Sequence, residues 1–139
     1  MQRRSRVVID TGVLVSAFAF GGIPQKSVIK ALDETEILVS PDILFEYREV
    51  PRVLLSGGKI DIIQFQSLIS GIAAFVSGAR VVYPTGKITL CRDPEDNMLL
   101  ECCKSGRADY LITGDRDLLD IEGLPFNLQV VSPRSFLLV

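Results

Sequence analysis

RVVID, at residues 6–10, is a short β-branched apolar run that ends in an acid, and it predicts a buried strand. Four further runs of the same kind follow along the chain: EILVS (36–40), ARVVY (79–83), DYLIT (109–113) and LQVVS (128–132). Strands this apolar are typical of a parallel sheet that is covered on both faces. We therefore expect an α/β fold, a three-layer α/β/α sandwich around a central parallel sheet.

Helical patterns fill the intervals between the predicted strands. The predicted helices cover residues 25–33, 41 to about 50 or a little beyond, 60–76, and 94 to about 105. Ser40 can cap the helix that starts at 41, and Pro41 suits its first position. Pro51 should kink or end that helix, because proline lacks the N–H of a helical hydrogen bond.

Length and composition predict a single domain, 1–139. Of the 139 residues, 47% are hydrophobic and 23% charged, as in ordinary globular chains. No apolar run approaches the roughly 18 residues of a membrane span, and the basic start lacks the apolar stretch of a signal peptide. Three cysteines, an odd number, do not make a disulfide framework. We expect a cytoplasmic protein that does not enter the membrane.

The ionisable residues narrow the possible chemistry. The formal net charge is −2 and the pI about 5.1, so the chain has no global basic surface for nucleic acid. A nuclease can still bind its substrate locally, with a few Arg and Lys around an acidic centre. The chain contains no histidine, which excludes Ser-His-Asp and Cys-His nucleophile systems and His-ligated zinc.

Two acids stand at the ends of predicted strands. Asp10 ends the first strand, and Asp115 comes just after DYLIT. Ligands of an open parallel sheet bind outside the carboxyl ends of its strands, so both acids are candidates for a functional site. Each also has a structural alternative, as the cap of the turn or short helix that follows. Asp117, from the same turn as Asp115, is a weaker candidate.

The stretch CRDPEDNMLLECC, residues 91–103, crowds three acids at the start of a predicted helix. Asp93, before a proline, has the position of an N-cap. At about 100° per residue, Asp96 continues the apolar stripe of the helix and should point toward the top of the sheet, whereas Glu101 falls on the opposite, solvated arc. Glu95 lies beside the stripe, and the helical angle neither selects nor excludes it.

The adjacent Cys102 and Cys103 are better explained by packing than by metal binding. They complete the apolar arc of this helix, and free cysteine is among the most buried residue types. Neighbouring helical residues point about 100° apart, and no CxxC partner exists, so zinc chelation is disfavoured. We expect both thiols in the core.

The helix that starts at residue 41 supplies a further candidate acid. Glu46 flanks an apolar face formed by Ile43, Tyr47, Val50 and Leu54. It would suit a site above the sheet, and the alternative is one solvated acid among several.

These acids would need a cation if they met, because carboxylates within about 4–6 Å raise one another's pKa. All-oxygen ligation suits Mg²⁺ or Mn²⁺ rather than zinc. Such a site can activate water and stabilise the attacking and leaving oxygens of a phosphodiester without histidine.

The chain resembles the PIN-domain family, in particular the VapC-like toxins of toxin–antitoxin pairs. The resemblance spans nearly the whole chain and rests on the order and spacing of VVIDTGVLVSA, SPDILFEYREVPRVL, DPEDNMLLECCKSGRADYLITGDRDLL and VVSPRSFL. It implies a PIN-like, Rossmann-like fold and a ribonuclease that depends on Mg²⁺ or Mn²⁺. Water activated by the metal would attack phosphorus and leave 5′-phosphate and 3′-hydroxyl ends.

Matched position by position, the resemblance assigns the roles of individual residues. The implied catalytic and metal-binding acids are Asp10, Glu46, Asp96 and Asp115. Implied supporting residues are the acids Asp93 and Asp117 and the hydroxyls Thr11 and Thr113. The implied partners are an RNA substrate and a small antitoxin protein. A homodimer through exposed apolar helix surface is also expected.

Gly12 departs from the family pattern, which has Asn or Ser after Asp-Thr. A polar group that would help to position metal or substrate is therefore missing. This leaves open an alternative function, a catalytically weakened PIN-fold module that binds RNA or a protein partner. Because the four main acids are intact, we expect an active endoribonuclease.

Overall fold

The computed structural model describes residues 3–139, so the first two residues of the predicted domain, Met1 and Gln2, lie outside the described residues. Five parallel strands form one sheet in the order β3-β2-β1-β4-β5. They are β1 (Arg6–Ile9), β2 (Glu36–Val39), β3 (Arg80–Val81), β4 (Tyr110–Ile112) and β5 (Gln129–Val131). The predicted α/β fold with a central parallel sheet is confirmed.

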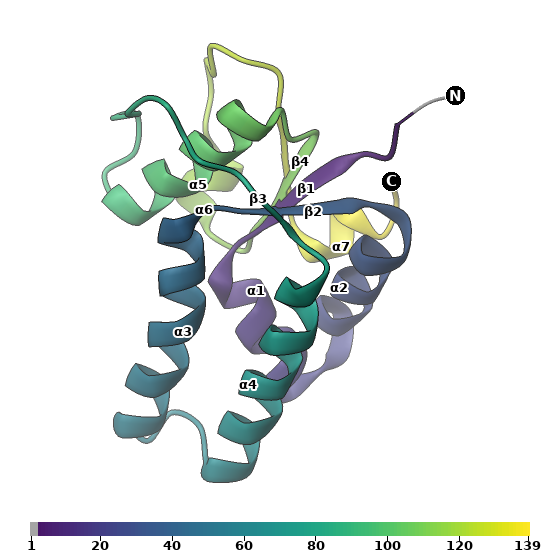
Figure 1. Ribbon diagram of the computed structural model, residues 1–139, viewed down its shortest axis with the longest axis vertical. Helices are drawn as coiled ribbons and strands as arrows, with labels where there is room; N and C mark the ends of the chain where they lie inside the picture. Colours follow the sequence, from purple (N-terminus) through teal and green to yellow (C-terminus); the bar gives the residue numbers. More distant parts are fainter. Residues whose placement is uncertain (1–2) are drawn as a thin grey trace.

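Helices connect the strands and cover both faces of the sheet. They are α1 (Thr11–Val15), the π-helix η1 (Ser16–Phe20), α2 (Gly22–Glu34), α3 (Pro41–Ser56), α4 (Ile62–Ser77), α5 (Pro94–Gly106), α6 (Arg116–Leu119) and α7 (Pro133–Phe136). α5 packs on β1, β2 and β4, whereas α2 packs on β2 and α7 on β5. Figure 1 shows α3 and α4 side by side, extending away from the sheet.

The strand order creates a reversal point beside β1. From β1 the chain moves to β2 on one side, and it later places β4 on the other side of β1. Ligands of such sheets bind in the crevice at this point, outside the carboxyl ends of the strands. The pairing of Ile9 with Ile112 brings Asp10 to this crevice, where its N–H donates to the carbonyl of Ile112 at 3.0 Å.

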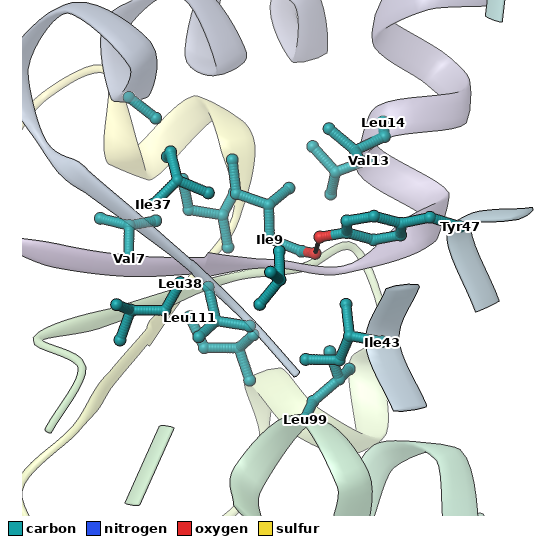
Figure 2. Close-up of a cluster of buried hydrophobic side chains, with 14 of the residues drawn as sticks. Val7, Ile9, Val13, Leu14, Ile37, Leu38, Ile43, Tyr47, Leu99 and Leu111 are labelled. Carbon is teal, nitrogen blue, oxygen red and sulfur yellow. Dashed lines mark hydrogen bonds between the residues drawn. The ribbon is translucent and has the colours of Figure 1, made fainter. Parts of the chain in front are cut away.

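The core holds α3 against the same end of β1. Tyr47 of α3 is fully buried and donates its hydroxyl to the carbonyl oxygen of Ile9. Figure 2 shows this contact, with Val13 and Leu14 on one side of β1 and Leu99 of α5 on the other. The helix that carries Glu46 is therefore fixed next to the strand that ends before Asp10.

Pro51 does not end the helix that starts at residue 41, because α3 continues through it to Ser56. Pro51 is buried four residues after Tyr47, on the same face of the helix. Packing of that face outweighs the one hydrogen bond that proline cannot make.

Residues 11–20 form α1 and η1, for which periodicity predicted no helix, and α2 begins at Gly22 rather than residue 25. This segment is nearly all apolar, so it shows no polar face by which a helix is recognised. Gly21 and Gly22 have φ values of 83° and 71°, and they let the chain bend by 112° between the helices.

The solvated position predicted for Glu101 is also wrong. Glu101 is only 7% exposed, and its carboxylate accepts a hydrogen bond from the N–H of Ile88 at 2.9 Å. The segment between β3 and α5 folds over this side of the helix, which the helical angle of a residue does not reveal.

Within residues 3–139, no single helix combines the length and apolar character needed to cross a membrane. Helices 11–20 and 22–34, at their 112° bend, would meet that test together by length and composition alone.

Candidate functional site

A pocket of about 140 Å³ lies at the carboxyl ends of β1 and β4. Its lining residues are Asp10, Thr11, Ile43, Glu46, Asp93, Glu95, Asp96, Met98, Leu99 and Asp115. The four acids predicted as metal ligands therefore meet in one pocket, although they come from distant parts of the chain. Glu46 lies in α3 and Asp96 in α5, whereas Asp10 and Asp115 directly precede α1 and α6. The lining contains no lysine or arginine.

Thr113 connects the two acids that follow strands. Its hydroxyl donates to Oδ2 of Asp10 at 2.7 Å and accepts the N–H of Asp115 at 3.0 Å. Thr113 is fully buried, so these bonds are shielded from water. Burial raises the pKa of Asp10, and the bond from Thr113 opposes that rise. The predicted supporting hydroxyl thus lies where it contacts the carboxyl group of Asp10 and the backbone of Asp115.

Two of the pocket acids also cap helices. Asp93 accepts the N–H of Glu95 at 2.9 Å at the start of α5, and Asp115 accepts the N–H of Asp117 at 2.9 Å at the start of α6. The structural alternative for Asp115 is therefore real, but capping and lining the pocket do not exclude each other. Asp10 precedes α1 without a side-chain capping bond to it.

Four of the pocket acids form two carboxyl pairs, Glu46 with Glu95 and Asp96 with Asp115. Burial raises the pKa of Glu46 to about 7, and hydrogen bonding and charge repulsion with Glu95 add to the rise. Burial, then repulsion from Asp115 and hydrogen bonding to it, raise the pKa of Asp96 to about 7. Each pair therefore holds a proton near neutral pH, where carboxylates without a cation would repel each other.

Glu95 is the pocket acid that sequence reasoning missed. Its helical angle left it undecided, and the family resemblance did not select it. What brings it to the pocket is the position of α3, because the partner of Glu95 is Glu46 on that helix. The available signal was its place in the first turn of the helix that Asp93 caps, which alone did not distinguish it from a solvated acid.

Asp117 is the predicted acid that the structure does not bring into the pocket. Its side chain is 53% exposed, and both of its oxygens accept from Nη2 of Arg92, at 3.0 and 2.8 Å. Thr11, by contrast, is buried and lines the pocket as expected.

The cysteines pack as predicted. Cys102 and Cys103 are buried and free. Burial raises the pKa of the Cys102 thiol to about 12 and that of Cys103 well above its usual value, so neither is a thiolate at neutral pH.

The pocket suits a hard cation by its donor chemistry. As the side chains stand, no three acidic or cysteine groups among residues 3–139 are close enough to hold a metal ion. Mg²⁺, however, commonly uses one or two carboxylates, with water and substrate phosphate completing its shell. Two protonated carboxyl pairs without a lysine or arginine fit such an ion, because a divalent charge would replace their protons.

Comparison with known proteins settles the family. A family model described as "PIN domain" matches residues 6–117. The chain belongs to the PIN-domain family. Proteins of this family are in general nucleases that use divalent metal ions. The family predicted from the order and spacing of the motifs is therefore confirmed.

One sequence relative and two solved structures show how far the similarity of this PIN-domain protein extends. The uncharacterized protein MJ1680 of Methanocaldococcus jannaschii is 32% identical over 95% of this chain and 89% of its own length. VapBC2 from Rickettsia felis, solved bound to a promoter DNA fragment, has a chain that aligns with a TM-score of 0.60 at 13% identity, over 90% of this chain and 98% of that one. PAE2754 from Pyrobaculum aerophilum aligns with a TM-score of 0.63 at 16% identity, over 96% of this chain and 88% of that one. The two structures share the fold.

Proposed function

We propose that this PIN-domain protein is an endoribonuclease that depends on Mg²⁺ or Mn²⁺. One observation carries the proposal: carboxylates from α3 and α5 and from the residues that directly precede α1 and α6 line one pocket at the reversal point of the sheet. Two of them, Glu46 and Asp96, have their pKa raised to about 7. Perturbed acids gathered in a cleft are typical of a functional site. Family membership supports the nuclease chemistry.

Asp10, Asp96, Asp115 and Glu46 would hold the metal. When bound, it would lower the pKa of water and neutralise charge on the phosphate oxygens. The Thr113 hydroxyl would hold the Asp10 carboxylate in a fixed orientation, because it donates to Oδ2 of Asp10. It would also fix the backbone from which the Asp115 side chain extends, because it accepts the N–H of Asp115. The products expected from hydrolysis by water are 5′-phosphate and 3′-hydroxyl ends.

We also propose that the protein is the toxin of a toxin–antitoxin pair and works in the cytoplasm as one domain over residues 1–139. The fold that it shares with VapBC2, a protein solved with promoter DNA, supports this role. A homodimer would use exposed apolar side chains of α3 and α4, such as Phe45, Val53, Ile63 and Ile69.

Purified protein should cleave single-stranded RNA in the presence of Mn²⁺ or Mg²⁺, and cleavage should stop when EDTA removes the metal. Asp10→Asn and Asp96→Asn should each lower kcat by at least about a hundredfold. Asp42→Asn, which changes an exposed acid in the first turn of α3, is the control and should retain activity. Undiminished cleavage in both pocket variants would refute the site.

One observation favours a second function, a module that binds RNA or a protein without cleaving. Gly12 offers no side chain to support Asp10. A cleavage assay and calorimetry together distinguish the two functions. A module of this kind would cleave no RNA in the assay and would bind no Mn²⁺ in the calorimeter.

A further inference from the structure

Arg92 makes an exposed ion pair at the edge of the acid pocket. We propose that Arg92 binds a phosphate of the RNA substrate, and that Asp117 is its partner in the RNA-free protein rather than a metal ligand. The proposal rests on the endoribonuclease function and assigns a substrate-binding residue to it.

The position of the pair ties it to the pocket. Arg92 directly precedes Asp93, which caps α5 and lines the pocket. Asp117 lies in the first turn of α6, where its N–H bonds to Oδ1 of Asp115, another lining residue. The Arg92–Asp117 pair therefore joins the starts of the two helices whose capping acids form the pocket.

The negative charge of the pocket explains why RNA binding would need a positively charged side chain at the pocket rim. Six of its ten lining residues are acids, and none is a lysine or arginine. A bound divalent ion neutralises only part of that charge, and the phosphates that flank the reacting one still approach an acidic rim. A guanidinium at the rim offsets the repulsion and supplies a fork that matches phosphate oxygens.

The existing contact is one that RNA can displace. The Arg92 side chain is 87% exposed, and that of Asp117 is 53% exposed. Exposed ion pairs contribute little to stability. Only Nη2 of Arg92 contacts Asp117, at 2.8 and 3.0 Å, so this carboxylate does not engage the whole guanidinium. An arriving phosphate would repel Asp117 and attract Arg92, which favours the exchange.

A second arginine–aspartate pair provides a matched control. Arg3 donates to both oxygens of Asp109, at 3.0 and 3.3 Å, and the two side chains are 51% and 38% exposed. Asp109 precedes β4, so this pair lies at the amino end of the strand whose other end faces the pocket. Its chemistry is similar, but its position is remote from the proposed substrate.

The test is RNA affinity and steady-state cleavage for Arg92→Ala, Arg92→Lys and Arg3→Ala. Affinity is measured by fluorescence anisotropy with labelled single-stranded RNA, in an Asp96→Asn background that prevents cleavage. Arg92→Ala should raise Kd and KM by about tenfold and leave kcat within about twofold. The slope of log Kd against log salt should fall by about one. Arg92→Lys should recover part of the affinity, and Arg3→Ala should match its parent.

Two results would overturn the role of Arg92: an unchanged Kd and KM in Arg92→Ala, or an equal loss in Arg3→Ala. Asp117→Asn should tighten RNA binding and keep the Mn²⁺ affinity measured by calorimetry. A fall in that affinity comparable to the fall in Asp96→Asn would make Asp117 a metal ligand instead. If the parent protein binds RNA but never cleaves it, the proposed nuclease fails, while the Kd comparison still decides the role of Arg92.

Discussion

The charged form of Asp96 should destabilise the metal-free fold. Its side chain is 5% exposed, and Asp115 and Asp93 repel its charged form. We expect Asp96→Asn to raise the free energy of unfolding of the metal-free protein by on the order of 1 kcal/mol at pH 8, because an amide carries no charge and can still donate to Asp115. Urea denaturation at pH 8 measures this.

The same substitution should have no stabilising effect at pH 5, where Asp96 is already protonated. A variant that is less stable than the parent at pH 8 without metal would show that the charge of Asp96 is well accommodated.

Gly12 lies where the resemblance to the family leads us to expect Asn or Ser, and the structure has room for a side chain there. A Cβ atom at Gly12 would meet no other atom within 4 Å. Gly12→Ser should stabilise α1 by about 0.5 kcal/mol, since glycine is a poor helix former. The added hydroxyl should also strengthen Mn²⁺ binding several-fold, as measured by calorimetry.

Gly12→Ala separates these two effects. It should give the same gain in helix stability and no gain in metal affinity. Equal Mn²⁺ affinity in both variants would mean that a polar group at this position does not act on the site.

At the scale of elements, α4 and η1 depend on a close approach. A Cβ atom at Gly71 of α4 would lie 2.4 Å from the ring of Phe18 in η1, well inside contact distance. Gly71→Ala should therefore lower the free energy of unfolding by about 1–3 kcal/mol, because the ring must move in a packed environment. Chemical denaturation measures the loss.

Gly78, at the end of α4, is the control for this change. A Cβ atom there would meet nothing within 4 Å, so Gly78→Ala should leave stability nearly unchanged. If both variants lose the same stability, the contact with Phe18 is not the cause.

Helix α3 also shows where rules based on local sequence fail to predict a helix boundary. Ser40 caps α3 as predicted, since its hydroxyl accepts the N–H of Ile43 at 3.2 Å. The same rules predicted a kink or an end at Pro51, yet α3 continues through this residue, which is buried against the core. Local chemistry predicts starts well because a cap acts within one turn, whereas continuation depends on what the helix packs against.

At the scale of the whole molecule, the acid pocket should make stability depend on pH. Glu46 and Asp96 have pKa values of about 7 in the folded protein, above the ordinary values of 4.5 for Glu and 3.8 for Asp. The folded state therefore binds more protons, and the stability that they contribute is lost as pH rises through about 7. We expect the metal-free protein to lose about 1–2 kcal/mol between pH 6 and pH 8.

Mn²⁺ should reverse this loss. Metal at about a hundred times its Kd adds roughly 2.7 kcal/mol, and the gain should be larger at pH 8, where fewer protons compete for the carboxylates. Thermal unfolding with Mn²⁺ and with EDTA at pH 6 and pH 8 tests this. Asp10→Asn should gain less stability from Mn²⁺ than the parent protein does. A metal-free stability that rises from pH 6 to pH 8 would contradict the assignment.

The sequence by itself determined the fold class, the parallel strands and most of the acids that meet in the pocket. Apolar runs of β-branched residues specify buried strands, and the absence of histidine excludes a His-ligated zinc site. Asp10, Asp96 and Asp115 were predictable because strand ends and helical angles are local properties. The single-domain prediction for 1–139 stays a prediction.

Only the tertiary structure decided which acids pair with which partners. Glu95 reaches the pocket because α3 places Glu46 beside it, and Asp117 stays outside because it pairs with Arg92. Glu101 is buried because a segment from another part of the chain covers it. Each outcome depends on a contact between segments that are separate in sequence, and no periodicity within one helix encodes such a contact.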